Sequence, residues 1–318
     1  MTSQRSTKKY YLLYFILFIV MCFAAFYPFI AEGKSFIWAA GVEDGLTQHF
    51  ESLAYWGHYL RKAVKSIFSG HPSLPMWNMN LGYGGDILST LNYYAIGDPL
   101  NLLYIFVPMK HTEVMYNFMI LLRMFLAGTA FMLYCRKMNK NNFASVMGAL
   151  VYVFCGFIFR SGLRHPFFIN PMIYFPLLCL GVEKIYKKER PYLFIAVTAV
   201  ASMSNFYFLY MLTIFTVIYA LIRFYQYYAE DRLKNFLVLL RGFAGYYILG
   251  VALSAVILLP AVSGFLGTGR GGGQVQVLYF IPGEFCGIWK QRTVDQCRFY
   301  SYSRHRCSVL DVFPPNET

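Results

Sequence analysis

Apolar runs long enough to cross a lipid bilayer recur along this chain. The first covers residues 11–31, and a helix needs only about 20 such residues to span the hydrocarbon core. Further runs lie at residues 114–135, 143–159, 167–182, 192–224 and 236–259. Hydrophobic residues make up 58% of the 318 residues, above the roughly 45–50% that is usual in soluble domains. The pattern predicts an all-α polytopic membrane protein.

The run at residues 192–224 is too long for one membrane-spanning helix. It is interrupted at residues 204–207 by the sequence SNFY, where a tight turn would divide the run into two spans. With this division the sequence predicts about seven transmembrane helices. Residues 1–9 then form a polar N-terminus, and residues 10–262 form the membrane module.

The basic residues follow the positive-inside rule for this layout. The net charge is +13, and the Lys and Arg residues fall mostly between the spans, at residues 5–9, 136–140, 184–190 and 223–234. With a cytoplasmic N-terminus these segments all lie inside, so residues 32–112 are expected outside the cytoplasm. Topology thus accounts for the charge, and no nucleic-acid partner is expected. The first run is expected to be retained, because it is too long for a signal peptide and no cleavage site follows it.

The long loop at residues 32–112 contains two further apolar segments. Residues 45–68 interleave apolar and basic side chains, as in an amphipathic helix that lies along the membrane interface. Residues 87–107 are apolar but are interrupted by Asn, Asp and Pro. This second segment is therefore predicted to be re-entrant or interfacial and not a span.

Residues 263–318 differ in composition from the membrane module. A Gly-rich stretch is followed by sequence rich in Arg, Cys, Ser and Tyr, with no apolar run long enough to span. Two explanations stay open: a small external tail, or a segment unrelated to the module, as a truncation or a shifted reading frame would produce. We expect the second.

Two adjacent carboxylates, Glu43 and Asp44, follow the first span at the membrane surface, where ionisable groups are often functional. Asp44 is the predicted catalytic residue, because a carboxylate there can act as a general base on an incoming hydroxyl. Gln48 would share a helical face with Asp44, and Glu43 and Gln48 are predicted substrate contacts. Alternatively, Asp44 only caps a helix. A carboxylate could also help to hold a divalent metal ion, but the His and Cys residues show no metal-ligand spacing.

Aromatic residues and a further carboxylate lie in the same external loop. Trp77, Tyr93 and Tyr94 offer flat apolar faces with polar edges, which suit a sugar, although a simple interfacial belt is the alternative. Asp98, a further external carboxylate, is another predicted substrate contact, although with Pro99 after it the residue would also cap a helix. The GYGG sequence at residues 82–85 is not a phosphate loop, since it lacks the GK[ST] ending.

Basic residues collect in another predicted external loop. Arg160, Arg164 and His165 form a compact cationic group there, and Arg recognises phosphate through paired hydrogen bonds. Snorkelling at the interface is the alternative. Asn205 and Tyr207 at the 204–207 turn are further candidate contacts, although the turn alone would account for an Asn there.

Several of these motifs together resemble a known family. The segments WN, LGYGGD and LNYYAIGDPLNLLY, the basic loop and SNFYFLYM resemble the YfhO family of bacterial membrane proteins over residues 8–268. That family is similar to GT-C-fold glycosyltransferases, which use polyprenyl-phosphate-linked sugars outside the cytoplasm. The resemblance implies a GT-C-like fold and glycosylation of cell-envelope polymers, with teichoic acid as the acceptor in some members. It also implies that Asp44 takes the place of the first-loop catalytic acid.

The resemblance therefore implies an inverting hexosyl- or N-acetylhexosaminyl-transferase. A polyprenyl-phosphate-linked sugar would be the donor, a cell-envelope polymer the acceptor, and the bilayer the third partner. Two alternatives stay open. One is a transporter or flippase of lipid-linked precursors, which would need polar residues at the bilayer midplane and a repeat between halves. The other is an inactive truncated membrane fragment.

Overall fold

The computed structural model describes residues 2–39, 44–81, 84–228 and 232–267. The chain divides into two units, Met1–Gly273 and Gln274–Thr318, and the fold below is that of the first unit. Glu43 and most of the predicted tail at residues 263–318 lie outside the described residues.

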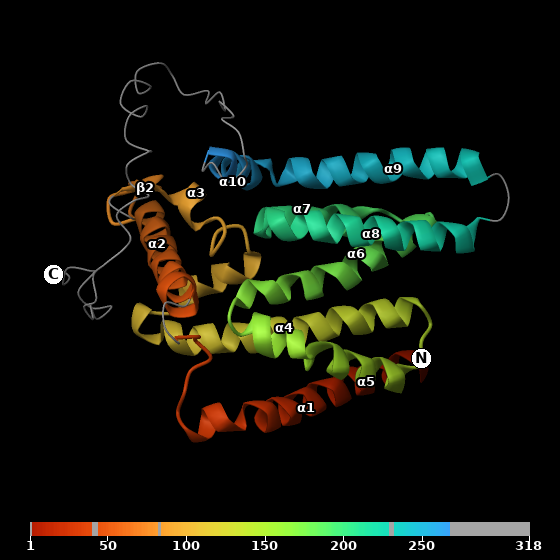
Figure 1. The fold of residues 1–318 in the computed structure, drawn as a ribbon, viewed down its shortest axis with the longest axis horizontal. Coiled ribbons are helices and arrows are strands. Elements are labelled where there is room, and N and C mark those ends of the chain that lie inside the picture. Colours follow the sequence, from red (N-terminus) through yellow and green to blue (C-terminus); the bar gives the residue numbers. More distant parts are fainter. Residues whose placement is uncertain (1, 40–43, 82–83, 229–231, 268–318) are drawn as a thin grey trace, which may run out of the picture. The chain divides into compact units, whose positions relative to one another are not determined.

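The described residues are largely helical, which confirms the all-α prediction (Figure 1). Five helices, some with the turn before them, are long and apolar enough to span a bilayer. They are α1 (Thr2–Ala31), α4 (Thr112–Lys137), α6 (Asn170–Tyr186), α8 (Phe206–Tyr227) and α9 (Arg232–Leu253). The strands in the described residues are β1 (Trp77–Asn78) and β2 (Gly85–Asp86), which form one short antiparallel pair. The chain is thus an all-α polytopic membrane protein.

Three apolar helices are shorter than a span: α5 (Asn142–Val153), α7 (Tyr192–Ser204) and α10 (Ala255–Gly267). Helices of 12 and 13 residues are only about 18–20 Å long, against a hydrocarbon core of about 30 Å. The predicted count of seven spans is therefore not confirmed by helix length. The predicted break is confirmed, because Asn205 is extended between α7 and α8.

The helices of the bundle pack side by side in Figure 1. Helix α4 packs on α5 and α6, α6 packs on α7 and α8, and α7 packs on α9. Gly250 is the buried residue of α9, and a Cβ there would lie 2.8 Å from the Thr198 side chain. Glycine therefore lets α9 approach α7 closely, as small residues do in membrane bundles.

Residues 44–111 gather at one end of the bundle, which we call the loop end. The π-helix η1 (Gly45–Phe50) runs into α2 (Glu51–Phe68), which lies across the bundle helices in Figure 1. This confirms the helix predicted over residues 45–68. Then come α3 (Ile87–Leu91) and the 3-10 helices η2 (Pro99–Phe106) and η3 (Met109–His111). No helix spans residues 87–107, as predicted.

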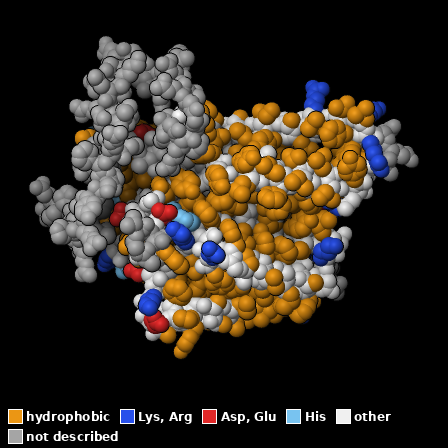
Figure 2. Space-filling model, in the orientation of Figure 1, with side chains coloured by type: hydrophobic (Ala, Val, Ile, Leu, Met, Phe, Trp, Pro, Cys, Tyr) orange, Lys and Arg blue, Asp and Glu red, His pale blue; other side chains and the backbone are white. Residues whose placement is uncertain are grey.

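Two short helical turns at the loop end connect α5 to α6. They are the π-helix η4 (Ile158–Gly162) and the 3-10 helix η5 (Pro166–Ile169). Between the loop end and the opposite end, side chains on the face shown in Figure 2 are predominantly apolar, with Lys and Arg near its margins. That surface suits a protein that crosses a membrane several times.

Candidate functional site

Asp44 stands at the start of η1 and is linked to a line of polar side chains. Gln48 Nε2 donates to Asp44 Oδ1 at 2.8 Å. The Tyr94 hydroxyl in turn donates to Gln48 Oε1 at 2.6 Å. The expected common face of Asp44 and Gln48 is therefore present, and the amide of Gln48 is held from both sides. The Asp44 carboxylate is half-buried, and these two hydrogen bonds fix its orientation.

Asp44 does not act as a side-chain cap, although it precedes η1 directly. Its backbone is already helical, with φ −61° and ψ −25°, and its carboxylate makes no capping hydrogen bond. Among the described residues, Gln48 is the only donor to this carboxylate, and the bond reaches Oδ1. In the part of the chain that the structure describes, no donor contacts Oδ2.

Two histidines connect η1 to the basic loop at residues 160–166. His49 Nε2 lies 2.6 Å from His165 Nδ1, so one imidazole donates to the other. His49 is 1% exposed, and its ring also contacts those of Tyr94 and Phe167. Burial, and then the neighbouring His165, lower the pKa of His49 to about 3. His49 is therefore neutral, and the pair fixes His165 next to η1.

Two tyrosines lie on the solvent side of the same group. Tyr93 is 40% exposed and Tyr207 is 53% exposed. Burial raises the pKa of Tyr93, and the nearby Tyr94, Tyr207 and Asp44 raise it further. The loop at residues 92–98 and the start of α8 thus bring two exposed aromatic rings to the neighbourhood of the Asp44 carboxylate.

Asp98 belongs to a buried polar network at the loop end of α4 and α6. Its Oδ2 accepts from Arg123 Nη2 and from Asn170 Nδ2, both at 2.8 Å. Arg123 also donates through Nη2 to Asn101 Oδ1 at 2.7 Å and through Nε to Asn170 Oδ1 at 3.0 Å. The other Asp98 oxygen accepts from the Leu100 amide at the start of η2. The expected capping role of Asp98 is thus present, and both its oxygens are occupied.

This network anchors the loop that carries Tyr93 and Tyr94. Asn170 Nδ2 reaches Ser204 Oγ at 3.3 Å, so α7 joins the network. Next to it, Gly97 has φ +93°, and a Cβ there would lie 2.0 Å from the Met203 carbonyl oxygen. Only glycine fits such a position. The loop is therefore pinned to three helices a few residues after the two tyrosines.

The remaining predicted residues lie on neighbouring elements. Trp77 is 43% exposed on a strand that is tied to α2 through Asn78 and the Tyr55 hydroxyl. Arg160 and Arg164 are exposed on the basic loop that carries His165. Asn205 caps α8, its Oδ1 accepting from the amides of Tyr207 and Phe208. The described contacts thus collect Asp44, Gln48, Tyr93, Tyr94, His165 and Tyr207 into one group.

Sequence reasoning missed several residues of these networks, among them Arg123 and His49. Arg123 interrupts the apolar run at residues 114–135, and a charge inside a membrane helix normally marks a buried partner. That signal was available in the sequence. The signal for His49 was weaker, because its neighbour His165 is 116 positions away and the pairing is formed only by the fold.

The described residues do not by themselves make a metal centre. They contain no group of three or more His, Cys, Asp or Glu side chains that could hold a metal ion. Asp44 with the neutral amide of Gln48 is a poor donor set for a divalent cation, which prefers several charged or carbonyl oxygens. Glu43, the other carboxylate of the pair, lies outside the described residues.

Comparisons with known proteins agree with the resemblance found in the motifs. No solved structure matches the chain. It is 30% identical over 211 residues to "Uncharacterized protein YfhO" of Bacillus subtilis (strain 168), an alignment that covers 60% of this chain and 24% of that protein. The aligned part thus spans about a quarter of the relative's length. A family model described as "Bacterial membrane protein YfhO" matches residues 13–302. Because that match covers most of the sequence, the chain belongs to the YfhO family of bacterial membrane proteins.

Proposed function

We propose that this YfhO-family chain carries the acid-bearing site of a membrane glycosyltransferase. The donor is a sugar on a polyprenyl-phosphate carrier, and the acceptor is a hydroxyl of a cell-envelope polymer such as teichoic acid. The donor and acceptor classes come from the family resemblance. The observation that carries the proposal is the Asp44 carboxylate, oriented by Gln48 and Tyr94, with one oxygen facing no described donor.

In the proposed reaction Asp44 acts as a general base. The acceptor oxygen attacks the anomeric carbon, its proton passes to Asp44 Oδ2, and the bond from that carbon to the carrier phosphate breaks. The configuration at the anomeric carbon inverts. A base positioned in this way accelerates such a step by about 10²–10⁴-fold. The hydrogen bond from Gln48 keeps the carboxylate from rotating away from the acceptor.

The leaving phosphate needs positive charge close to the membrane surface. Arg160 and Arg164 are exposed on the basic loop, and the His49 contact fixes His165 on the same loop. We assign these three residues to the phosphate, since preorganised donors at a developing charge lower the barrier. Tyr93, Tyr207 and Trp77 of β1 would line the sugar-binding site. Glu43 and Asn205 remain proposed substrate contacts, and Asp98 is assigned to holding the loop.

The proposed orientation places the loop end outside the cytoplasm and the N-terminus inside. The Lys and Arg residues at the ends of α4, α6 and α8 away from the loop end support it, because cytoplasmic segments are enriched in these residues. The carrier-linked sugar would then meet the polymer on the extracytoplasmic face. A GT-C-like arrangement of the helices is part of the same proposal.

The test replaces Asp44→Asn in cells where this gene is the only YfhO-family gene. Asn keeps the shape of the side chain and its bond with Gln48 but cannot accept a proton at neutral pH. The sugar content of the envelope polymers should fall to the level of the gene deletion, with the protein still present in membranes.

Asp86→Asn is the matched control. Asp86 is a second loop-end carboxylate that caps α3 by accepting from the Ser89 amide, and Asn caps about as well as Asp. This control should leave glycosylation unchanged. Normal glycosylation by Asp44→Asn at normal protein level would refute the assignment of the base.

A further inference from the structure

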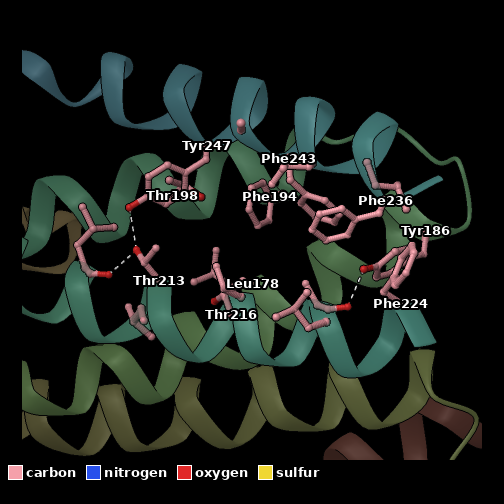
Figure 3. A pocket seen from close by; sticks show the side chains of 18 residues that line it. Leu178, Tyr186, Phe194, Thr198, Thr213, Thr216, Phe224, Phe236, Phe243 and Tyr247 are labelled. Atoms are coloured by element: carbon pink, nitrogen blue, oxygen red, sulfur yellow. Dashed lines mark hydrogen bonds between the residues drawn. The ribbon is translucent and has the colours of Figure 1, made fainter. Parts of the chain in front are cut away.

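A long apolar groove runs along the bundle between α8 and α9. Its floor is formed by α6 and α7, and the cavity volume is about 370 Å³. Figure 3 shows rings of α9 and side chains of α8 facing each other across it. None of the lining side chains is charged. Its polar atoms are hydroxyl groups, and those of Thr198 and Thr216 have no described partner. The groove therefore suits a hydrocarbon.

Two contacts join α8 and α9 across the groove. Near the loop end, the Thr213 hydroxyl and the Tyr247 hydroxyl are 2.7 Å apart. Near the opposite end, the rings of Phe224 and Phe236 meet edge to face with centroids 5.7 Å apart. Between them, the lining residues Val217, Leu221 and Leu240 are exposed. A chain in the surrounding lipid can thus enter the groove sideways.

The length of the groove distinguishes between kinds of lipid chain. On α8 the lining residues run from Leu209 to Phe224, a rise of about 22 Å at 1.5 Å per residue. One leaflet contributes only half of the roughly 30 Å hydrocarbon core, about 15 Å. The groove therefore extends past the bilayer midplane. An ordinary phospholipid tail ends near the midplane, whereas a long polyprenyl chain can continue beyond it.

The groove also leads toward the candidate site. Leu209 lies one helical turn after Asn205, and Tyr207 lies between them at the loop end. A lipid in the groove with its head group at the loop end would present that head group near Tyr207. Ring contacts through Phe208 and Phe167 connect Tyr207 to Tyr93 of the candidate site. The exposed Arg160 and Arg164 lie on the basic loop at the same end of the bundle.

We propose that the α8–α9 groove binds the hydrocarbon chain of a long-chain polyprenyl phosphate with its phosphate at the loop end. This inference rests on the proposed function and deepens it, since it assigns the carrier chain a place in the fold. The groove would select the carrier by chain length, and the site at the loop end would act on its sugar.

The test measures equilibrium binding of a radiolabelled long-chain polyprenyl phosphate to the chain in phosphatidylcholine nanodiscs. Farnesyl phosphate and phosphatidylglycerol are the unlabelled competitors. The long-chain lipid should bind at least about ten-fold more tightly than farnesyl phosphate, a difference of about 1.4 kcal/mol. Phosphatidylglycerol should compete no better than farnesyl phosphate. This arm needs no variant, so it is decisive even if a substitution unfolds the protein.

Filling the groove from each wall provides the second arm. Ala220→Phe on α8 and Ala244→Phe on α9 add a ring at lining positions. Each should weaken binding of the long-chain lipid about ten-fold and leave farnesyl phosphate little changed. Ala252→Phe is the matched control, because Ala252 is exposed on α9 outside the groove. It should leave binding unchanged.

The outcomes separate this inference from the proposed function. If both prenyl phosphates bind equally and groove filling changes neither, the groove assignment is wrong while a phosphate site stands. If phosphatidylglycerol competes as well as the long-chain lipid, the groove takes ordinary lipid and the carrier assignment is wrong. If no prenyl phosphate binds, the proposed function fails together with the groove.

Discussion

Replacing Arg123→Met should expose how strongly the buried network holds the loop end together. Arg123 is 1% exposed and Asp98 is 5% exposed. The guanidinium donates to Asp98, Asn101 and Asn170. Met fills a similar volume but leaves the Asp98 carboxylate buried without its counter-charge. Removing one partner of a buried ion pair costs roughly 3–5 kcal/mol, a large part of a typical stability of about 5–15 kcal/mol.

The double variant Arg123→Met with Asp98→Asn tests the cause of this loss. Asn removes the orphaned charge and keeps one oxygen, which can accept from the Leu100 amide as Oδ1 does. Its NH2 group replaces Oδ2 and can donate to the Asn170 side-chain oxygen once the Asn170 amide turns, because that oxygen has lost its Arg123 donor. More than half of the lost stability should return, because replacing both members of a buried pair by neutral groups is far less costly than removing one. A simple loss of packing at position 123 would instead persist in the double variant.

The assay is thermal unfolding in detergent, followed by a dye that reacts with cysteine thiols as they become exposed. Cys179 is 3% exposed and Cys22 is 8% exposed in the fold, and both are free thiols. The single variant should unfold at a midpoint lowered on the order of 10 °C, from the size scaling of the unfolding entropy. A loss below about 1 kcal/mol, or a double variant no more stable than the single, would refute the reasoning.

Two further predictions concern the loop end. The pKa of His49 is about 3 in the fold against about 6.5 in an unfolded chain. As the pH drops, the unfolded chain therefore takes up the proton first. The free energy of unfolding should fall by up to roughly 1.4 kcal/mol per pH unit between pH 6.5 and about pH 3. Unfolding midpoints at several pH values should show this fall to be smaller in His49→Gln, and equal slopes would count against it. Gly97→Ala should be about 1–3 kcal/mol more destabilising than Gly70→Ala because of steric overpacking. Both glycines have positive φ, but of the two only Gly97 has backbone atoms within 4 Å of an added Cβ. Equal shifts of the unfolding midpoint would argue against that clash.

Local signals in the sequence predicted the helical parts of the fold well. Apolar length identified α1, α4, α6, α8 and α9, and the interruption at Asn205 identified the break between α7 and α8. The period of residues 45–68 identified η1 and α2. These features depend on neighbours within a few positions, so the sequence carries them directly. The shortness of α5 and α7 was not predicted, because apolar residues continue past the ends of these helices.

The sequence predicted the shared helical face of Asp44 and Gln48 but not the long-range contacts around it. The spacing of Asp44 and Gln48 indicated a shared face because both lie on one helical turn. Tyr94 reaches Gln48 from 46 positions away, and Arg123 pairs with Asp98 from 25 positions away. Such pairings depend on how the loop folds back onto the bundle. The sequence indicated polar residues at one membrane face, and the fold decided which of them became structural anchors.

The central claim is tested most directly by sugar transfer in detergent, where no bilayer remains to be crossed. Protein purified from cells that use this gene is mixed with a polyprenyl-phosphate-linked sugar and the acceptor polymer, and the initial rate of transfer is measured. The claim predicts transfer by the wild type, a fall of about 10²–10⁴-fold for Asp44→Asn, and an unchanged rate for Asp86→Asn. Equal rates for Asp44→Asn and the wild type, or transport of the carrier in vesicles without transfer in detergent, would contradict it.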